Sequence, residues 1–386
     1  MTSATRLSPA WRRRAFTACL TGLTAALMSA GTLAETVKIG VVQGLSGPPA
    51  ITDFGESYLQ GMELALKEYR AAAPKHVIEM IVYNDEANPQ RAVSLVQRLI
   101  SNDKVSAIVG TVNSGNVAAF APMIQQAKLP LMAGPAIASD ITLKFINESP
   151  SYIFRCSMVE KYQVDAMLDW GVKNFKKIGL LHSTNGYGMF AAGEIQKGMQ
   201  TRNVQLVAVE SGAPTVTDLT PQLLKLKNAG AELVLLFHDS LELVYRGMPK
   251  AGYKPVIAGN WGLSSQMVLN IVGKEAIEGT VMGQALDLSD PKAIEFDAKM
   301  KREFSTKYRW PVVAVLGYDG MRLLLQAVDA AGSNPDKIRD ALEQISNFKA
   351  VSGAPAKPYS AKDHECLDAD DVFLGVWRDG KVVRLK

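Results

Sequence analysis

Cysteine and histidine are scarce in this chain of 386 residues, which contains three cysteines and four histidines. The histidines, at positions 76, 182, 238 and 364, do not gather with the cysteines into a cluster of zinc ligands, so no metal site is expected. The sequence also lacks a Gly-x-Ser-x-Gly elbow and a His-Glu-x-x-His pair, which are signatures of hydrolases. These absences argue against an enzyme and against a bound cofactor.

Long apolar runs are also missing, apart from one near the amino terminus. Residues 1–34 contain four arginines, no acidic residue, and an apolar stretch from residue 15 to about residue 28. This arrangement is typical of a secretory signal, because the stretch is shorter than the roughly 18 residues of a membrane-spanning helix. Small residues at the cleavage positions, Thr32 and Ala34, predict removal after Ala34. We therefore expect the mature chain in a periplasm.

Two other export signals match the leader less well than this general signal. Residues 13–16 resemble part of a twin-arginine signal, but Thr17 and Ala18 replace the apolar and basic residues that are usual there. A lipoprotein anchor at Cys19 is disfavoured, because only four residues separate it from Arg14 and the apolar run continues beyond it. The general secretory route is the preferred interpretation.

Excess charge is absent once the leader is removed. The arginines of the leader, at positions 6, 12, 13 and 14, equal the whole formal excess of +4. The mature chain is then neutral, so its net charge does not indicate a nucleic-acid partner or an anionic membrane surface. A composition of 47% hydrophobic and 21% charged residues is that of a globular protein.

Strand-like apolar runs alternate with helix-period segments along the chain, and its length exceeds what one compact core normally holds. Repeated alternation predicts parallel sheets covered by helices, and two series predict two doubly wound α/β lobes. Asp379-Gly380 between two apolar runs predicts a final hairpin. The two series are 37–42, 57–70, 77–83, 89–100, 105–110, 116–127 and 129–134, then 152–155, 177–182, 189–202, 204–210, 221–227, 233–237, 241–251 and 256–259.

In open α/β sheets a ligand sits beyond the carboxyl ends of the strands, so the loops that follow these runs are the candidate site. They are residues 44–55, 111–116, 135–140, 183–188, 238–240 and 260–264. Ser114-Gly115-Asn116 precedes a helix, where free backbone amides attract a carboxylate. The same residues are also an ordinary helix cap, and both interpretations stay open.

The mature chain resembles a type I periplasmic binding protein of the leucine/isoleucine/valine-binding family, which serves ABC transporters. No single matching segment is specific to this family, but the order of the segments along the mature chain is specific to it. The resemblance implies two lobes, 35–155 plus about 287–360 and 156–286 plus about 361–386, which close over a ligand by a hinge. The matching segments are 38–40 with 45–48, Gly61 with 64–66, Asp85 with Pro89 and Ala92, 109–110, 135–136, 186–188, 251–253 and Gly279 before a strand.

The resemblance also implies site residues. Ser114 matches the serine that binds the ligand carboxylate, and Ala136 matches a residue whose backbone takes part in binding. Tyr187 matches a tyrosine of the second lobe that closes over the ligand, and Phe54 roughly matches an aromatic of the first lobe. For Phe54 and Tyr187 a plain packing role is the alternative.

Two departures from the family bear on the ligand. Ala138 stands where amino-acid-binding relatives usually carry a threonine that contacts the ammonium, and Trp261 stands near their acidic residue. A buried ammonium without acceptors is costly, so an amino acid needs another partner. Asp239 is a candidate, although it could instead cap the helix that follows it. Trp261 could stack on an aromatic ligand. A branched-chain or related amino acid is the first expectation, and an aromatic or other small carboxylate or amide is the second.

The expected partners are a small-molecule ligand and a membrane ABC permease, and the protein is expected to be a monomer. A DNA-binding regulator on the same fold would carry a helix-turn-helix where this chain has its export signal. Cys156 and Cys366 remain after export, and an oxidising compartment permits them to pair. The sequence does not show whether they lie close enough, so a disulfide and two buried thiols both stay open.

Overall fold

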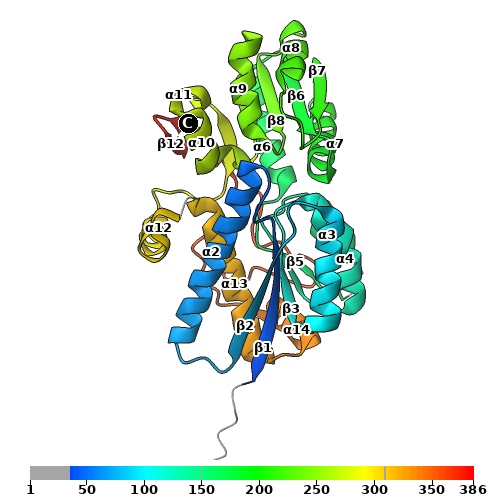
Figure 1. Ribbon diagram of the computed structural model, residues 1–386, viewed down its shortest axis with the longest axis vertical. Coiled ribbons are helices and arrows are strands. Elements are labelled where there is room, and N and C mark those ends of the chain that lie inside the picture. The colour runs from blue at the N-terminus through cyan, green and yellow to red at the C-terminus, as the bar shows by residue number, and fades with distance from the viewer. Residues whose placement is uncertain (1–34, 149, 308–309) are drawn as a thin grey trace, which may run out of the picture. The chain divides into compact units, whose positions relative to one another are not determined.

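The computed structural model describes residues 35–148, 150–307 and 310–386, and the expected signal segment 1–34 lies outside them. Two sheets organise the part from Thr36 onward (Figure 1). One has five strands in the order β2-β1-β3-β4-β5, and the other has seven in the order β12-β11-β10-β9-β8-β6-β7. The predicted fold class, α/β with two doubly wound lobes, is confirmed.

The first sheet is parallel throughout, since each strand returns through a helix. Helices α3 and α4 cover one face of it, and α2 lies on the other (Figure 1). Its strands are β1 (Thr36–Gln43), β2 (Val77–Asn84), β3 (Ala107–Gly110), β4 (Leu131–Ala133) and β5 (Ile153–Arg155). Its helices are α2 (Pro49–Ala71), α3 (Pro89–Arg98) with a π turn (Leu99–Asp103), α4 (Ser114–Ala127) and α5 (Asp140–Ile146).

The second sheet is parallel except for its last two strands, which form the predicted hairpin. Asp379 and Gly380 both have positive φ, at 50° and 75°, as a tight hairpin turn requires. The strands are β6 (Ile178–Ser183), β7 (Ala208–Gly212), β8 (Leu233–Phe237), β9 (Val256–Gly259), β10 (Val281–Gln284), β11 (Phe373–Arg378) and β12 (Lys381–Arg384). The helices are α6 (Glu160–Asn174), α7 (Gly186–Thr201), α8 (Thr220–Asn228), α9 (Leu241–Ala251), a 3-10 turn (Trp261–Ser264), α10 (Gln266–Val272) and α11 (Lys274–Ile277).

After β10 the chain returns to the first sheet through α12 (Pro291–Phe304), a 3-10 turn (Ser305–Lys307), α13 (Pro311–Ala331) and α14 (Pro335–Gln344), none of which was assigned from the sequence. Helix α13 packs tightly on α2: a Cβ on Gly61 would lie 1.9 Å from Ala314 O. The expectation that no second apolar stretch reaches membrane-spanning length is wrong for α13, which is long and apolar enough. Its most apolar window is 83% buried inside the structure, as in a core helix.

Two other expectations need correction. Residues 44–55 are not a loop throughout, because α2 begins at Pro49, where proline is tolerated in a first helical turn. Strand β7 begins at Ala208 rather than at residue 204. The chain near residue 361 has not yet left the first sheet, since Arg155 forms a parallel bridge with Glu365. The lobe boundaries themselves stay a prediction.

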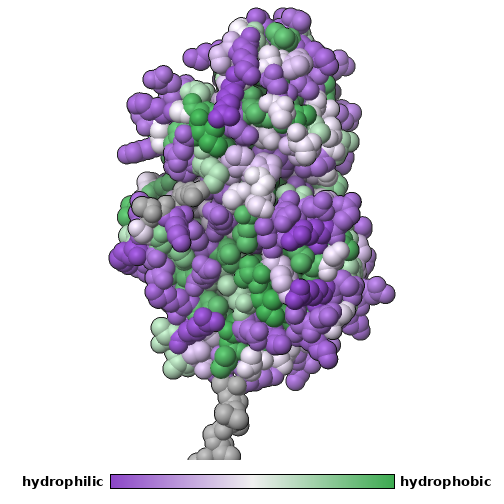
Figure 2. All heavy atoms as spheres, viewed as in Figure 1, coloured by the Kyte–Doolittle hydropathy of each residue, from purple (hydrophilic) through white to green (hydrophobic). Residues whose placement is uncertain are grey.

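The viewed surface is mostly hydrophilic over the helices (Figure 2). Apolar residues are visible between α2 and α3, where the edge strand β2 is only partly buried (Figure 2). The buried core lies under the helices on both faces of the two sheets.

Candidate functional site

A pocket with an empty volume of about 470 Å³ lies among the loops that follow strands of both sheets. From the side of the first sheet, it is lined by the start of α2, by the loop after β3 and by the loop after β4. From the side of the second sheet, it is lined by Tyr187, by the turn after β8 and by the turn after β9. The structure thus brings together Phe54, Ser114, Tyr187, Asp239 and Trp261, all predicted from the sequence.

Ser114 lies at the first turn of α4 and is 1% exposed. Its Oγ accepts hydrogen bonds from the backbone N–H groups of Ile137 (3.3 Å) and Ala138 (3.2 Å). The helix cap is Asn113, whose side chain accepts from Gly115 N at 2.9 Å. Ser114 is therefore not the cap that the sequence left open. Its hydroxyl hydrogen remains available to an acceptor in the pocket.

Ala136 and Ala138 are buried but do not line the pocket, whereas their neighbours Pro135 and Ile137 do. The N–H of Ala136 donates to Thr111 O at 3.1 Å. The carbonyl of Ala138 accepts from Arg155 Nη1 at 2.7 Å. A role for the Ala136 backbone in binding stays a prediction, and its N–H already has an acceptor.

The rings of Phe54, from α2, and Trp261, from the turn after β9, are in contact, and both residues line the pocket. Their ring centroids are 4.9 Å apart, and Trp310 lies 4.3 Å from Phe54 on another side. The backbone N–H of Trp261 donates to Gln163 Oε1 at 3.0 Å. Trp261 is 1% exposed, so packing holds its ring firmly while one part lines the pocket. Both the packing role and the lining role that the sequence allowed are present.

Tyr187 follows β6 and is held by a residue that the sequence analysis did not single out. Its hydroxyl oxygen accepts from Asn260 Nδ2 at 2.7 Å, and Asn260 Oδ1 accepts from Gly262 N at 2.9 Å. Burial raises the pKa of Tyr187 well above its ordinary value, so the phenol stays protonated. Its proton can then be donated to a ligand. The position of Asn260 directly after a strand was the only signal that could have identified it.

Asp239 is 3% exposed and is held by residues of the loop after β6. Its Oδ2 accepts from Ser183 Oγ (2.6 Å) and Asn185 Nδ2 (2.9 Å). Burial raises the pKa of this carboxyl, although the two hydrogen bonds oppose the rise. The cap position of α9 belongs to Ser240, and no side-chain bond caps that helix. The alternative role of Asp239 as a helix cap is therefore wrong.

His238 lies beside Asp239 in the pocket wall. Its Nδ1 accepts from Ser240 N at 3.0 Å, which assigns the ring proton to Nε2 in the neutral form. Burial lowers the pKa of His238 to about 4, so the ring is neutral at pH 7. Among the described residues that line the pocket, Asp239 is then the one acidic side chain, and neither lysine nor arginine lines it.

Elements next to the pocket touch one another directly. A Cβ added to Gly186, at the start of α7, would lie 2.8 Å from the Cα of Gly115, at the start of α4. On the other side, Asp53 of α2 accepts from Ser265 Oγ (2.8 Å) and from Met267 N (3.1 Å) at the start of α10. Elements that follow strands of the two different sheets therefore meet around the pocket.

Comparison with known proteins gives a consistent result. The model of the periplasmic binding protein family matches residues 36–381. The chain is 28% identical over 375 residues to the Leu/Ile/Val-binding protein homolog 8 of Brucella melitensis, covering 90% of this chain and 89% of that protein.

Solved structures share the fold. A periplasmic binding protein type 1 from Bordetella pertussis Tohama I has a TM-score of 0.81 at 22% identity, covering 91% of this chain and 100% of that one. The solute binding protein of an ABC transporter from R. palustris, in complex with 4-hydroxybenzoate, has a TM-score of 0.74 at 23% identity, covering 91% and 96%. The matched residues include every strand of both sheets except most of β12, and every loop of the pocket. The resemblance drawn from the sequence is thereby confirmed, and this chain belongs to the periplasmic binding protein family.

Proposed function

We propose that this chain is the extracytoplasmic solute-binding component of an ABC importer and that it captures an α-amino acid with an apolar side chain, of the branched-chain or a related type. The observation that carries the proposal is the charge of the pocket. Asp239 lines it as a buried carboxylate, and no cation lines it from the described residues. A buried carboxylate favours a positively charged group on the ligand, because an unpaired buried charge is costly.

The other end of an amino acid would find its partners at α4. The hydroxyl of Ser114 favours a carboxylate through a hydrogen bond, and the positive end of the α4 helix dipole favours it as well. Ser114 lies at the start of α4, which follows a strand of the first sheet, and Asp239 follows β8 of the second sheet. A zwitterion therefore satisfies both sides of the pocket, whereas a simple carboxylate would bring a second negative charge to Asp239.

The ligand side chain would lie against apolar walls. Ile51, Val112, Ile137, Leu241 and the Phe54-Trp261 pair line the pocket. A branched aliphatic side chain buried there gains roughly 25 cal/mol per Å² of apolar area removed from water. This lining supports an apolar amino acid rather than a polar one.

Capture is proposed to proceed by closure of the two lobes. The approach of Gly115 to Gly186 and the bonds from Asp53 to α10 are contacts that an open form would lose. The chain would bend at its crossings near residues 155 and 287 and beyond Cys366. The ligand would then be held by groups from both sheets, which supports the family mechanism of hinge closure.

The proposed role is capture and delivery without chemical conversion. The leader expected at residues 1–34 would direct the chain to the periplasm, where a membrane permease receives the ligand. A monomer suffices, because residues of one chain line the pocket on both sides.

A second candidate ligand is an aromatic carboxylate, and the pair formed by Phe54 and Trp261 is the observation that favours it. Aromatic contacts add about 0.5–1.5 kcal/mol beyond the burial of area. The related structure with 4-hydroxybenzoate illustrates that the fold accommodates such a ligand. The charge of Asp239 is the argument against it.

A thermal-shift screen tests the proposal, since a ligand that binds only the folded form raises the melting temperature by mass action. The screen would contain leucine, isoleucine, valine, phenylalanine, 4-hydroxybenzoate and small amides. Stabilisation by the apolar amino acids is the expected result. Stabilisation by 4-hydroxybenzoate alone would establish the second candidate, and no shift with any amino acid would contradict the first.

A further inference from the structure

The two cysteines that remain after export lie on neighbouring segments of backbone. Arg155 N donates to His364 O at 2.9 Å, and Cys366 N donates to Arg155 O at 3.1 Å, which makes Arg155 and Glu365 a parallel bridge. Cys156 and Cys366 are the next residues on the two segments. Neighbouring strands lie about 4.7–4.9 Å apart. A disulfide requires Cα atoms about 4.4–6.8 Å apart, so the backbone spacing suits one.

The direction of the side chains suits a disulfide as well. Arg155 and Glu365 form a buried ion pair, so both side chains lie on one side of the paired segments. Because side chains alternate along extended backbone, Cys156 and Cys366 share the opposite side. Both are 0% exposed. Burial first, and then a hydrogen bond with Cys366, raises the pKa of the Cys156 thiol, which is consistent with two thiols in contact.

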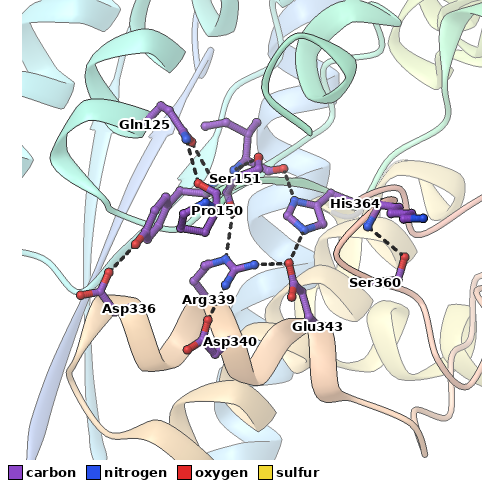
Figure 3. Close-up of polar contacts among 12 residues, drawn as sticks. Gln125, Pro150, Ser151, Asp336, Arg339, Asp340, Glu343, Ser360 and His364 are labelled. Atoms are coloured by element: carbon purple, nitrogen blue, oxygen red, sulfur yellow. Dashed lines mark hydrogen bonds and ion pairs between the residues drawn. The ribbon is translucent and has the colours of Figure 1, made fainter. Parts of the chain in front are cut away.

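The segment that carries Cys366 is held firmly in register. His364 lies between two partners: its Nδ1 is 2.9 Å from Ile153 O, and its Nε2 is 3.0 Å from Glu343 Oε1 (Figure 3). Arg339 of α14 forms an ion pair with the same Glu343 and donates to Ser151 O at 3.1 Å (Figure 3). These contacts hold the segment that carries Cys366 against β5. In the structure Cys156 and Cys366 are both buried free thiols.

We propose that Cys156 and Cys366 form a disulfide in the exported protein, which cross-links the segment leaving β5 to the segment that returns beside it. The oxidant is a protein or small-molecule disulfide of the extracytoplasmic space. One cysteine thiolate attacks that disulfide to give a mixed disulfide, and the second thiolate displaces the oxidant. The two thiols lose two protons and two electrons, and the oxidant leaves as a dithiol or as two thiols. The exchange takes place during folding, before both sulfur atoms are buried.

The cross-link would restrict the unfolded chain, and it would join two segments of the proposed hinge. It joins residues far apart in the sequence, so it removes conformational entropy from the unfolded state and stabilises the fold. It also ties together two of the segments that run between the sheets, next to the Arg155-Glu365 pair. This inference uses the proposed export of the chain but does not depend on the ligand.

The test counts free thiols in the exported chain. Protein isolated from the periplasm is denatured in iodoacetamide without reductant, digested and mapped by mass spectrometry. The expected result is a cross-linked pair of peptides, with no adduct on Cys156 or Cys366, and an adduct on each after reduction. Adducts on both cysteines without reduction would overturn the proposal.

Two controls keep the result interpretable. In Cys366→Ala, Cys156 should carry an adduct without reduction, which shows that the reagent reaches it on denaturation. Wild-type protein that is reduced, denatured and refolded with glutathione disulfide should regain the same cross-linked peptides, and failure to do so would count against the proposal. Reduction should lower the melting temperature of the wild type and leave that of Cys366→Ala unchanged. Ligand binding, measured separately, is independent of both outcomes.

Discussion

The two sides of the pocket present different polar groups. The side of the first sheet offers the hydroxyl of Ser114 at the amino terminus of α4, with no charged side chain from the described residues. The side of the second sheet offers a buried carboxylate, Asp239, next to a neutral imidazole, His238. The difference teaches that the pocket has a polarity: one side suits the anionic end of a ligand, and the other suits its cationic end.

Removing the charge of the second side is expected to have the largest effect. Asp239→Asn should weaken binding of an apolar amino acid by about 2–5 kcal/mol, or roughly 30-fold to several thousandfold, because the ammonium loses its buried partner. Isothermal calorimetry measures the change. Asp218→Asn, at an exposed carboxylate, is the matched control and should leave the affinity unchanged. Equal affinities for Asp239→Asn and wild type would place the ammonium elsewhere.

Removing the hydroxyl of the first side should have a smaller effect of a different kind. Ser114→Ala should cost about 1.5–3 kcal/mol, or roughly 10- to 150-fold, for any ligand with a carboxylate. The loss should be similar with and without an amino group on the ligand. Ser94→Ala, on the exposed face of α3, is the control. Unchanged affinity in a folded Ser114→Ala variant would remove Ser114 from the site.

The sequence predicted some parts of this contrast and missed others for identifiable reasons. The run Leu233–Phe237 is buried throughout and was recognised as a strand, which placed Asp239 at a strand end. The start of α2 was missed, because residues 44–55 were assigned to one loop, which includes Gly55. In the structure that glycine permits close packing, since a Cβ there would lie 2.2 Å from Gly44 O. The hairpin turn, by contrast, was predicted correctly, because the dipeptide Asp379-Gly380 is by itself a signal for such a turn.

Local sequence patterns could not predict which side chains in the site form hydrogen bonds with one another. Asn260 and Tyr187 are 73 residues apart, and Ser183 and Asp239 are 56 apart, so their hydrogen bonds exist only once the strands are side by side. Helix α13 was missed because most of its residues are buried, which leaves no polar face to mark a helical period. Residues whose role depends on such pairing are those that sequence patterns do not reveal.

Closure between the two sides can be tested without touching the ligand. Gly186→Ala should weaken binding of every ligand by about 1–3 kcal/mol, because the added methyl would press on Gly115 and hold the sides apart. Gly193→Ala on the same helix is the control, since a Cβ there meets no atom within 4 Å. Small-angle scattering should show less compaction on binding for Gly186→Ala than for the control. The same compaction and affinity in both variants would contradict closure through this contact.

The smallest expected effect is that of His238 protonation on the stability of the protein. The pKa of His238 is lowered from 6.5 to about 4 by burial, so the unfolded chain binds more protons than the folded chain between these values. His238 should therefore reduce the stability of the ligand-free protein as the pH falls from about 6.5 to about 4. His238→Asn keeps an acceptor for Ser240 N and removes this titration. Chemical denaturation across that range should show a shallower loss of stability in the variant than in wild type.

The polarity of the pocket is tested most directly by calorimetry of the wild-type protein with two ligands that differ only in the amino group, leucine and 4-methylpentanoate. Both present the same carboxylate to Ser114 and the same side chain to the apolar walls. The account predicts that leucine binds and that 4-methylpentanoate binds at least about 30-fold more weakly, because only leucine pairs with Asp239. Equal or tighter binding of 4-methylpentanoate would contradict it.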